Sequence, residues 1–203
     1  DFLDIFKIDK DHIGIYIADV SGHGVPASML TVFLRSSINK RTLSPAEALN
    51  QLYKEFNRDY YDQELYITVF YAIIDTKNKS IVYSNAGHNA SPILFNSESH
   101  RFDILRIPGV PISDWVDNPG YTEKSISIGK GDRLFMYTDG IVELRNSKSE
   151  QFGEERLLNI LLGEKVSPAM TLDRIIDAAM EFANIKNFNK IIDDITMALL
   201  EIV

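Results

Sequence analysis

The sequence predicts an α+β fold in which an antiparallel sandwich of strands is covered by helices. Four stretches have the apolar spacing of helices, and they occur along the chain as two pairs. Eight or more stretches have the alternation typical of strands, and most neighbouring strands are separated by short hairpin-like turns. No repeat, low-complexity tract or linker interrupts residues 1–203, so we expect one domain.

The helices are indicated by apolar stripes and by residues that favour helix starts. The first is expected at about 26–40, with Pro26 in its first turn. The second begins at Ser44-Pro45-Ala46-Glu47, where Ser44 caps the helix and Glu47 is expected to reach back to it. Two further helices are expected at about 154–162 and from Ser167-Pro168 onward. We interpret their apolar stripes as core.

The strands are indicated by β-branched and aromatic residues bounded by turn residues. They are expected at 2–8, 13–19, 65–74, 80–85, 93–95, 102–107, 121–128, 133–138 and 195–203. Residues 108–120 contain three prolines, two glycines and the sole tryptophan, Trp115, which predicts a long loop.

Composition excludes several classes of function. Cysteine is absent, which rules out disulfides and a thiolate nucleophile. The net charge of -8 argues against nucleic-acid binding and favours divalent cations. No apolar run approaches the roughly 20 residues that span a bilayer, and no signal peptide is visible. We therefore expect a cytoplasmic domain without membrane contact. We also expect it to be the C-terminal part of a longer protein, and that longer protein could itself be anchored in a membrane.

The most informative stretch is the strand that ends at Asp19. Isoleucines at every second position, 13, 15 and 17, predict one buried face, and a Gly-rich turn containing His23 follows. A carboxylate at the tip of a buried strand is costly to desolvate unless it is paired or binds a cation. Glycines beside it let the backbone approach a ligand closely.

Two other acids resemble Asp19 in their placement. Asp139 ends a strand, and Asp193 is expected to begin the last one, each in phase with apolar neighbours. In antiparallel neighbours the end of one strand lies beside the start of the next, so the three acids can share one rim. Each acid taken alone is typical of a turn. Together they favour a site for Mg²⁺ or Mn²⁺, because like charges repel unless a proton or cation intervenes.

Five motifs occur in the order seen in a known family. They are Asp19-Val-Ser-Gly-His-Gly-Val-Pro-Ala27, Asn85-Ala-Gly-His88, Gly131-Asp-Arg-Leu-Phe-Met-Tyr-Thr-Asp-Gly-Ile-Val-Glu143, Phe152-Gly-Glu-Glu-Arg-Leu157 and Asp193-Asp-Ile-Thr196. The chain thereby resembles bacterial SpoIIE-type, RsbU-like serine phosphatases, the metal-dependent type 2C-like enzymes of sigma-factor partner switching. The resemblance implies an α-β-β-α sandwich of two mainly antiparallel sheets and two Mn²⁺ or Mg²⁺ ions.

The resemblance also implies an activity and partners. The activity is hydrolysis of phosphoserine or phosphothreonine on a protein by a metal-activated water at a dinuclear site, without a covalent intermediate. The expected substrate is a phosphorylated anti-sigma factor antagonist, and sensor or linker domains are expected upstream. A homodimer remains open.

Site residues are carried over by motif. Asp19 corresponds to the bridging carboxylate and the Val20 carbonyl to a ligand of one ion, while Asp139 and Asp193 correspond to ligands of the other. Three further acids have lesser implied roles. Asp1 holds metal-bound waters, and Asp194 ranks below Asp193 as a metal ligand. Glu143 either helps to hold a third, weaker ion or is a solvated acid at the start of a helix. His23 either protonates the leaving serine oxygen or packs in its turn, and His88 is expected to be a hydrogen-bonded corner residue.

Two other functions remain open from the sequence. A pseudo-phosphatase would keep the fold and bind a partner without turnover. A serine hydrolase would use Ser21 near His23, although Asp19 stands where the Gly-x-Ser-x-Gly elbow needs glycine. No phosphate-cradling Gly-x-x-x-x-Gly-Lys-Ser/Thr loop is present, so nucleotide hydrolysis by that route is unsupported.

Overall fold

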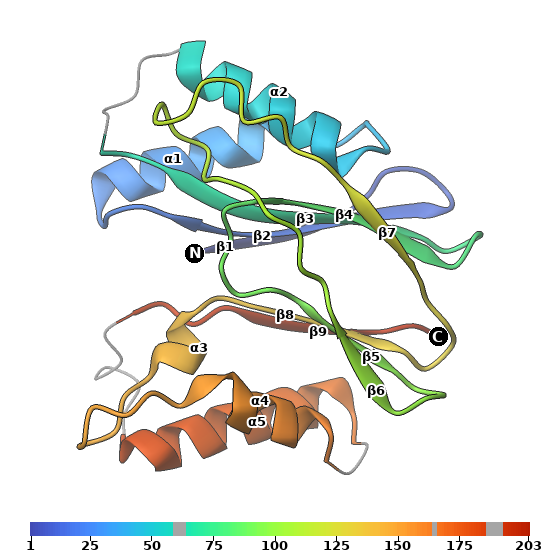
Figure 1. Cartoon of the computed structure of the whole chain (residues 1–203), viewed down its shortest axis with the longest axis vertical. Helices are drawn as coiled ribbons and strands as arrows, with labels where there is room; N and C mark the ends of the chain where they lie inside the picture. Colours follow the sequence, from blue (N-terminus) through green and yellow to red (C-terminus); the bar gives the residue numbers. More distant parts are fainter. Residues whose placement is uncertain (59–63, 164–165, 186–192) are drawn as a thin grey trace. The chain divides into compact units, whose positions relative to one another are not determined.

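A computed structural model of the chain describes residues 1–58, 64–163, 166–185 and 193–203 (Figure 1). It divides into two compact units. The first unit comprises Asp1–Ser91 and Arg106–Gly129, and the second comprises Pro92–Leu105 and Lys130–Val203. Within the described residues, no helix has the length and apolar character needed to cross a membrane.

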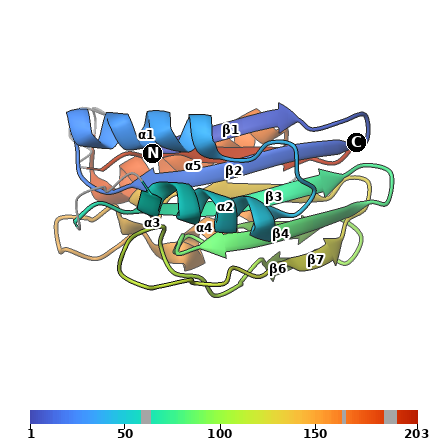
Figure 2. The same ribbon diagram turned by 90° about the horizontal axis from the view of Figure 1, so that it is seen from above.

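The first unit is a five-stranded antiparallel sheet in the order β1-β2-β3-β4-β7. Its strands are β1 (Phe2–Lys7), β2 (His12–Val20), β3 (Ile67–Asp75), β4 (Ser80–Ala86) and β7 (Lys124–Ser127). Helices α1 (Val25–Ser37) and α2 (Pro45–Arg58) cover one face of this sheet. Viewed from above in Figure 2, α1 lies along β1 and β2, and α2 lies over β3 and β4.

The two faces of β2 are used differently. Tyr16, Ala18 and Val20 belong to the core that α1 and α2 close. The alternation of a strand therefore places Ile17 and Asp19 on the face away from these helices. Ile17 is completely buried and Asp19 is half-buried. The predicted phase of Asp19 with the isoleucines is confirmed.

The start of α2 confirms one part of the predicted capping pattern and corrects another. The backbone N–H of Glu47 donates to Ser44 Oγ at 3.1 Å, so Ser44 is the cap. The Glu47 carboxylate does not reach back to the Ser44 amide. It accepts a hydrogen bond from the Thr42 hydroxyl, and the Ser44 amide donates to Thr42 Oγ1 at 3.1 Å. A neighbouring threonine thus supplies the contact that the sequence pattern assigned to Glu47.

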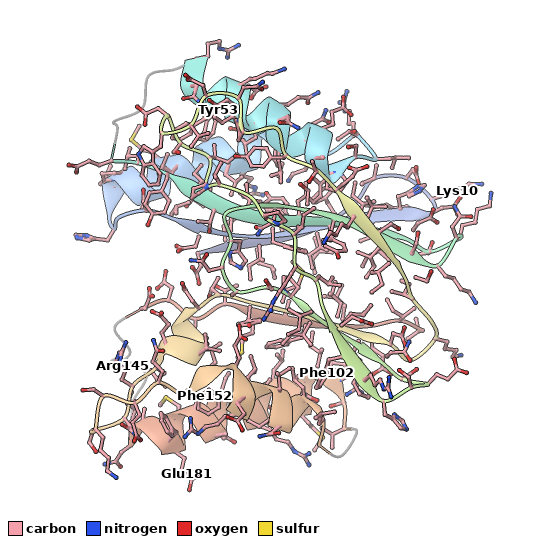
Figure 3. The ribbon with its side chains drawn as sticks, viewed as in Figure 1. Lys10, Tyr53, Phe102, Arg145, Phe152 and Glu181 are labelled. Atoms are coloured by element: carbon pink, nitrogen blue, oxygen red, sulfur yellow. The ribbon has the colours of Figure 1, made fainter. Side chains whose placement is uncertain are left out.

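The loop predicted at 108–120 is tied to α2. The Tyr53 hydroxyl, which points toward this loop in Figure 3, donates to the Val116 carbonyl at 2.8 Å and accepts from the Asn118 amide at 3.3 Å. Asn57 Nδ2 donates to the Ser113 carbonyl at 3.2 Å. The loop is therefore held at several points by side chains of one helix.

The second unit is a four-stranded antiparallel sheet in the order β6-β5-β8-β9, with helices packed on one face (Figure 1). Its elements are β5 (Ile93–Asn96), β6 (Arg101–Ile104), β8 (Arg133–Tyr137), α3 (Gly140–Glu143), α4 (Gly153–Leu161), α5 (Pro168–Ala183) and β9 (Met197–Glu201). Ser167 caps α5 by accepting from the Met170 amide. The buried ring of Phe152, labelled in Figure 3, lies beside the helices of this unit. It contacts the ring of Phe182 of α5, with centroids 5.8 Å apart.

The last strand is shorter than predicted. It begins at Met197, not at Ile195, so Asp193 and Asp194 precede the strand and do not begin it. The predicted fold class, α+β with two mainly antiparallel sheets and helices, is confirmed.

A buried tyrosine provides a first test of the core. The Tyr71 hydroxyl is the one buried side-chain polar atom in the described ranges that lacks a hydrogen-bond partner. Tyr71→Phe is therefore expected to leave the free energy of unfolding unchanged or raise it by up to about 1 kcal/mol, since an unsatisfied buried group is removed. Urea unfolding measures this change.

Tyr16→Phe is the matched control, because the rings of Tyr16 and Tyr71 are 6.0 Å apart and the Tyr16 hydroxyl donates to Asp4 at 3.4 Å. Tyr16→Phe is expected to lower the free energy of unfolding by roughly 0.5–1 kcal/mol. A larger loss in Tyr71→Phe than in Tyr16→Phe would contradict this description of the core.

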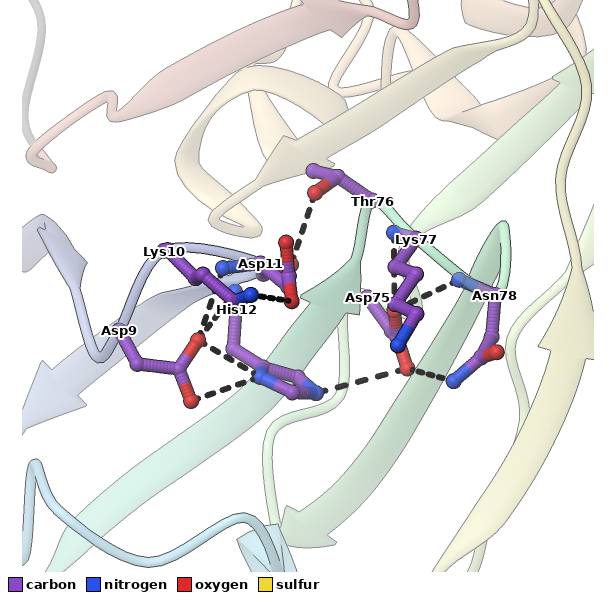
Figure 4. Close-up of polar contacts among 8 residues, drawn as sticks. All are labelled: Asp9, Lys10, Asp11, His12, Asp75, Thr76, Lys77 and Asn78. Carbon is purple, nitrogen blue, oxygen red and sulfur yellow. Dashed lines mark hydrogen bonds and ion pairs between the residues drawn. The ribbon is translucent and has the colours of Figure 1, made fainter.

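The turns at one end of the first sheet form a charged cluster (Figure 4). His12 Nδ1 lies 2.8 Å from Asp9 Oδ1, and His12 Nε2 lies 3.4 Å from Asp75 Oδ2. The Asp9 hydrogen bond raises the pKa of His12 above its usual value. Hydrogen bonds from backbone amides lower the pKa of both carboxyls. The main donor is the amide of Asp11 for Asp9 and the amide of Asn78 for Asp75.

The signs of these shifts give a pH dependence. The contribution of His12 is fully present below its unfolded pKa of about 6.5 and is lost as the pH rises through the raised folded value. The wild type is therefore expected to lose more stability than His12→Gln between pH 6 and pH 8. Urea unfolding at both pH values measures the difference, and equal losses in the two proteins would contradict the assignment.

Candidate metal centre

In the first unit, three oxygen-bearing side chains form a row at one end of the sheet. Asp19 pairs with Thr68 of β3. Phe2 pairs with Ala18, so the same register places Asp1 opposite Asp19. Directly opposite residues of antiparallel strands share a face. Asp1, Asp19 and Thr68 therefore lie side by side on the face away from α1 and α2.

Thr68 links this row to the corner that contains His88. Thr68 Oγ1 lies 3.4 Å from the Asp19 carbonyl oxygen and 3.3 Å from His88 Nδ1. His88 is only 4% exposed, and its amide donates to Asn85 Oδ1 at 2.9 Å. His88 is thus the hydrogen-bonded corner residue that the sequence predicts. The contact of Thr68 was not predicted, since only strand register places it beside Asp19.

The turn after Asp19 depends on glycine for its backbone conformation. Gly22 and Gly24 have φ angles of 80° and 71°, and a Cβ atom at either position would meet open space. Conformation, and not crowding, therefore demands glycine here. Ser21 Oγ accepts from the Tyr66 amide at 2.8 Å, so its hydroxyl closes the loop onto the segment before β3. His23 is exposed, so the alternative in which it packs within its turn gains no support.

In the second unit, Asp139 lies between the end of β8 and α3, where it is the N-cap residue and is half-buried. The Thr138 amide donates to the Thr196 carbonyl at 3.0 Å, and the Thr196 amide donates to Thr138 Oγ1 at 3.0 Å. A Cβ atom on Gly140 would overlap the carbonyl oxygen of Asp194. Asp139 is therefore held against the Asp193-Asp194 segment, although Asp139 and Asp193 are 54 positions apart along the chain.

The remaining acids of this unit lie close to the surface. Asp193 and Asp194 are exposed, and the Asp194 amide donates to Asp193 Oδ1 at 2.9 Å. Asp193 precedes the strand and is exposed, so the prediction that it avoids a solvated surface is wrong. It nevertheless lines a pocket whose other residues are mostly apolar, among them Ile141 and Leu172, so its predicted position beside apolar side chains is confirmed. Glu143 follows Asp139 by one turn of α3, as predicted, and is exposed. Its carboxylate accepts from Gln151 at 3.4 Å.

The candidate ligands are divided between the two units. Asp1 and Asp19 belong to the first, whereas Asp139, Asp193 and Glu143 belong to the second. Within the ranges that the structure describes, neither unit alone gathers three His, Cys, Asp or Glu side chains into a metal-binding cluster. The meeting of Asp19 with Asp139 and Asp193 stays a prediction. The donor set fits hard divalent cations, because it consists of carboxylate and carbonyl oxygens without thiolates.

Comparison with known proteins decides the family. The family model of Stage II sporulation protein E (SpoIIE) matches residues 9–203. The chain belongs to the SpoIIE family. Protein IcfG of Synechocystis sp. is 29% identical over 97% of this chain and 35% of its own length. Phosphoserine phosphatase RsbP of Bacillus subtilis is 30% identical over 70% of this chain and 36% of its own length. The chain thus spans about a third of these relatives.

Solved structures show the same fold for this SpoIIE-family chain. The SiaA-PP2C domain of Pseudomonas aeruginosa matches with a TM-score of 0.84 and 17% identity, covering 100% of this chain and 80% of that one. RsbX in complex with magnesium matches with a TM-score of 0.65 and 16% identity, covering 97% of this chain and 85% of that one. The predicted type 2C phosphatase-like fold is confirmed.

Proposed function

We propose that this chain is a metal-dependent protein serine/threonine phosphatase that hydrolyses phosphoserine or phosphothreonine on a protein. The observation that carries the proposal is the packing of Asp139 and Gly140 against the Asp193-Asp194 segment. It brings the backbones of two segments that are remote along the chain together within one unit. Relatives named phosphoserine phosphatases support the same activity.

The proposed ligands are carboxylate and carbonyl oxygen atoms. Asp19 would bridge two ions, the Val20 carbonyl would bind one of them, and Asp139 and Asp193 would bind the other. Asp1 would hold bound water molecules, since register places it opposite Asp19. Glu143 would bind a third ion. When bound, two Mn²⁺ or Mg²⁺ ions supply the Lewis acidity that makes a water molecule nucleophilic near neutral pH. The magnesium complex of RsbX supports this choice of ion.

The residues of the chain have further proposed roles in the reaction. The carboxylates orient the attacking water by accepting its hydrogen bonds. His23 is exposed in the turn that follows Asp19, and its proposed role is to give a proton to the leaving serine oxygen. The chain contains no cysteine, so no thiolate attacks phosphorus, and we propose direct attack without a covalent intermediate.

We infer that the substrate is a phosphorylated anti-sigma factor antagonist in the cytoplasm, and that upstream sensor or linker domains control access to it. The resemblance to partner-switching phosphatases supports this inference, as does the relative RsbU of Bacillus subtilis, named a phosphoserine phosphatase. Incubation of the chain with phosphorylated candidate antagonists and Mn²⁺ would identify the substrate by loss of its phosphate.

A phosphate-release assay with a phosphoserine peptide tests the proposed activity. We expect turnover with Mn²⁺ and none in a chelator. Turnover that is unchanged in the chelator would contradict the proposal. Tight binding of a phosphorylated partner without any turnover in Mn²⁺ would also contradict it and would establish the pseudo-phosphatase alternative.

A further inference from the structure

A polar pocket of about 460 Å³ lies in the first unit, beside the corner after β4. Among the residues that line it, six carry side-chain N–H or O–H groups: Asn85, His88, Asn89, Ser91, Arg106 and Lys124. No acidic residue is among the lining residues that the structure describes, although the chain as a whole carries a net charge of -8. The charge of the residues that line this pocket is therefore opposite in sign to the net charge of the protein.

The two cations stand at one side of the pocket. Arg106 and Lys124 are both exposed, and Lys124 Nζ donates to the Arg106 carbonyl oxygen at 3.0 Å. Across the described parts of the chain, no carboxylate forms an ion pair with either side chain. Guanidinium and ammonium groups bind oxyanions through charge-assisted hydrogen bonds. The pocket thus offers two uncompensated positive charges.

The wall of the pocket is preformed. Asn85 Nδ2 donates to the carbonyl oxygens of His88 and Ile107, at 3.2 and 3.1 Å. A Cβ atom on Gly109 would overlap the Asn85 carbonyl oxygen, so the two backbones are in direct contact. Gly87 has a φ angle of 75°, and a Cβ atom there would overlap Pro111. A site that needs little ordering keeps more of its interaction energy for the ligand.

The pocket is connected to the candidate metal centre through a short chain of contacts. His88 lines the pocket and contacts Thr68, and Thr68 contacts the carbonyl oxygen of Asp19. All these residues belong to the first unit. Along this path, two side chains, those of His88 and Thr68, lie between the pocket and Asp19.

We propose that this pocket binds a second anionic group of the phosphorylated protein substrate, a carboxylate or phosphoryl group that flanks the scissile phosphoserine. The inference rests on the proposed phosphatase function. Arg106 and Lys124 supply the charge, while Asn89 and Ser91 supply neutral donors. The pocket then selects substrates in which the phosphoserine has acidic neighbours.

The kinetic test uses two phosphoserine peptides that differ only in the residues beside the phosphoserine. These residues are Asp or Glu in the acidic peptide and Asn or Gln in the amide peptide. The double substitution Arg106→Gln and Lys124→Gln is expected to raise KM for the acidic peptide about tenfold, with kcat unchanged. It is expected to leave KM for the amide peptide as it was. Lys54→Gln and Arg101→Gln, which remove exposed charges elsewhere, are the matched controls and should change neither value. Equal effects on both peptides would overturn the proposal.

A binding test separates this proposal from the phosphatase function. The fluorescence anisotropy of a labelled acidic peptide without phosphoserine is titrated with the protein in a chelator. We expect binding to the wild type and the control variants, and at least tenfold weaker binding to the double variant. If the acidic peptide binds in this way but no phosphopeptide is hydrolysed, the phosphatase function is rejected and the proposed anion-binding pocket is retained. If phosphopeptides are hydrolysed but the labelled peptide binds the wild type and the double variant equally, only the proposed role of the pocket is rejected.

Inorganic phosphate provides the last arm of the test. If the pocket binds the substrate, inorganic phosphate competes only weakly with the labelled acidic peptide. Phosphate replaces one anionic group of the peptide, whereas the peptide makes several contacts. The contrary outcome has two parts: phosphate displaces the peptide as readily as it would fill a site for phosphate alone, and the pocket binds acidic and amide peptides equally. That outcome would identify a site for the phosphate product and overturn the proposal.

Discussion

Asp139→Asn is expected to lower kcat for phosphoserine hydrolysis by roughly 100-fold or more, because a proposed metal ligand loses its negative charge. The substitution keeps the shape of the side chain. The Asp139 side chain makes no capping hydrogen bond at the start of α3, so the fold should tolerate the change. A phosphate-release assay across a range of Mn²⁺ concentrations measures the loss. Partial recovery at high Mn²⁺ would show that affinity for the ion has fallen.

The control for this variant is Asp177→Asn, which removes an exposed carboxylate from α5. It should retain wild-type activity and urea stability. Wild-type kcat in Asp139→Asn at every Mn²⁺ concentration would remove Asp139 from the proposed centre. Unfolding of Asp139→Asn at a much lower urea concentration would instead assign it a structural role.

Gly140→Ala is expected to lower both stability and activity. Alanine suits the first turn of a helix, but its Cβ atom would overlap the carbonyl oxygen of Asp194. The Asp193-Asp194 segment must then move away from Asp139. Crowding of this kind typically costs about 1–3 kcal/mol of unfolding free energy. We expect activity to fall roughly tenfold or more even where the variant is fully folded, since a small misplacement of ligands is costly.

Gly153→Ala separates crowding from backbone strain. Gly153 has a φ angle of 77° at the start of α4, and a Cβ atom there meets nothing within 4 Å. Its replacement should destabilise the protein by about 1 kcal/mol through strain and leave kcat unchanged. Urea unfolding and phosphate release are measured for both variants. Full activity of folded Gly140→Ala would contradict the proposed role of the Asp193-Asp194 segment.

Features with local causes could be predicted from the sequence. The alternation of isoleucines before Asp19 correctly predicts β2 and the burial of its Ile15 and Ile17 face. It does not predict that Tyr16 and Ala18 on the opposite face are buried as well, because that burial depends on the helices that cover the sheet. Prolines 26, 45 and 168 mark helix starts correctly, because proline suits the first turn wherever the helix packs. The β1–β2 hairpin follows from a short polar turn between two strand-like stretches.

Features that depend on distant partners were predicted less well. Ile195 and Thr196 continue the alternation of the last strand, yet the Thr196 amide bonds to the Thr138 hydroxyl, so β9 starts at Met197. Thr68 carries no local signal, and only the pairing of β2 with β3 places it beside Asp19. The placement of acids at strand ends singled out Asp19, Asp139 and Asp193, and the family resemblance assigned them roles as metal ligands.

Calorimetric titration of Mn²⁺ into four proteins tests the central claim most directly. The proteins are the wild type, Asp19→Asn, Asp139→Asn and the double variant. If Asp19 and Asp139 bind one pair of ions, the wild type binds two Mn²⁺ per chain, and each single variant loses most of the affinity. The double variant then loses far less than the sum of the two losses. Independent, additive losses, or no binding by the wild type at millimolar Mn²⁺, would contradict a shared centre.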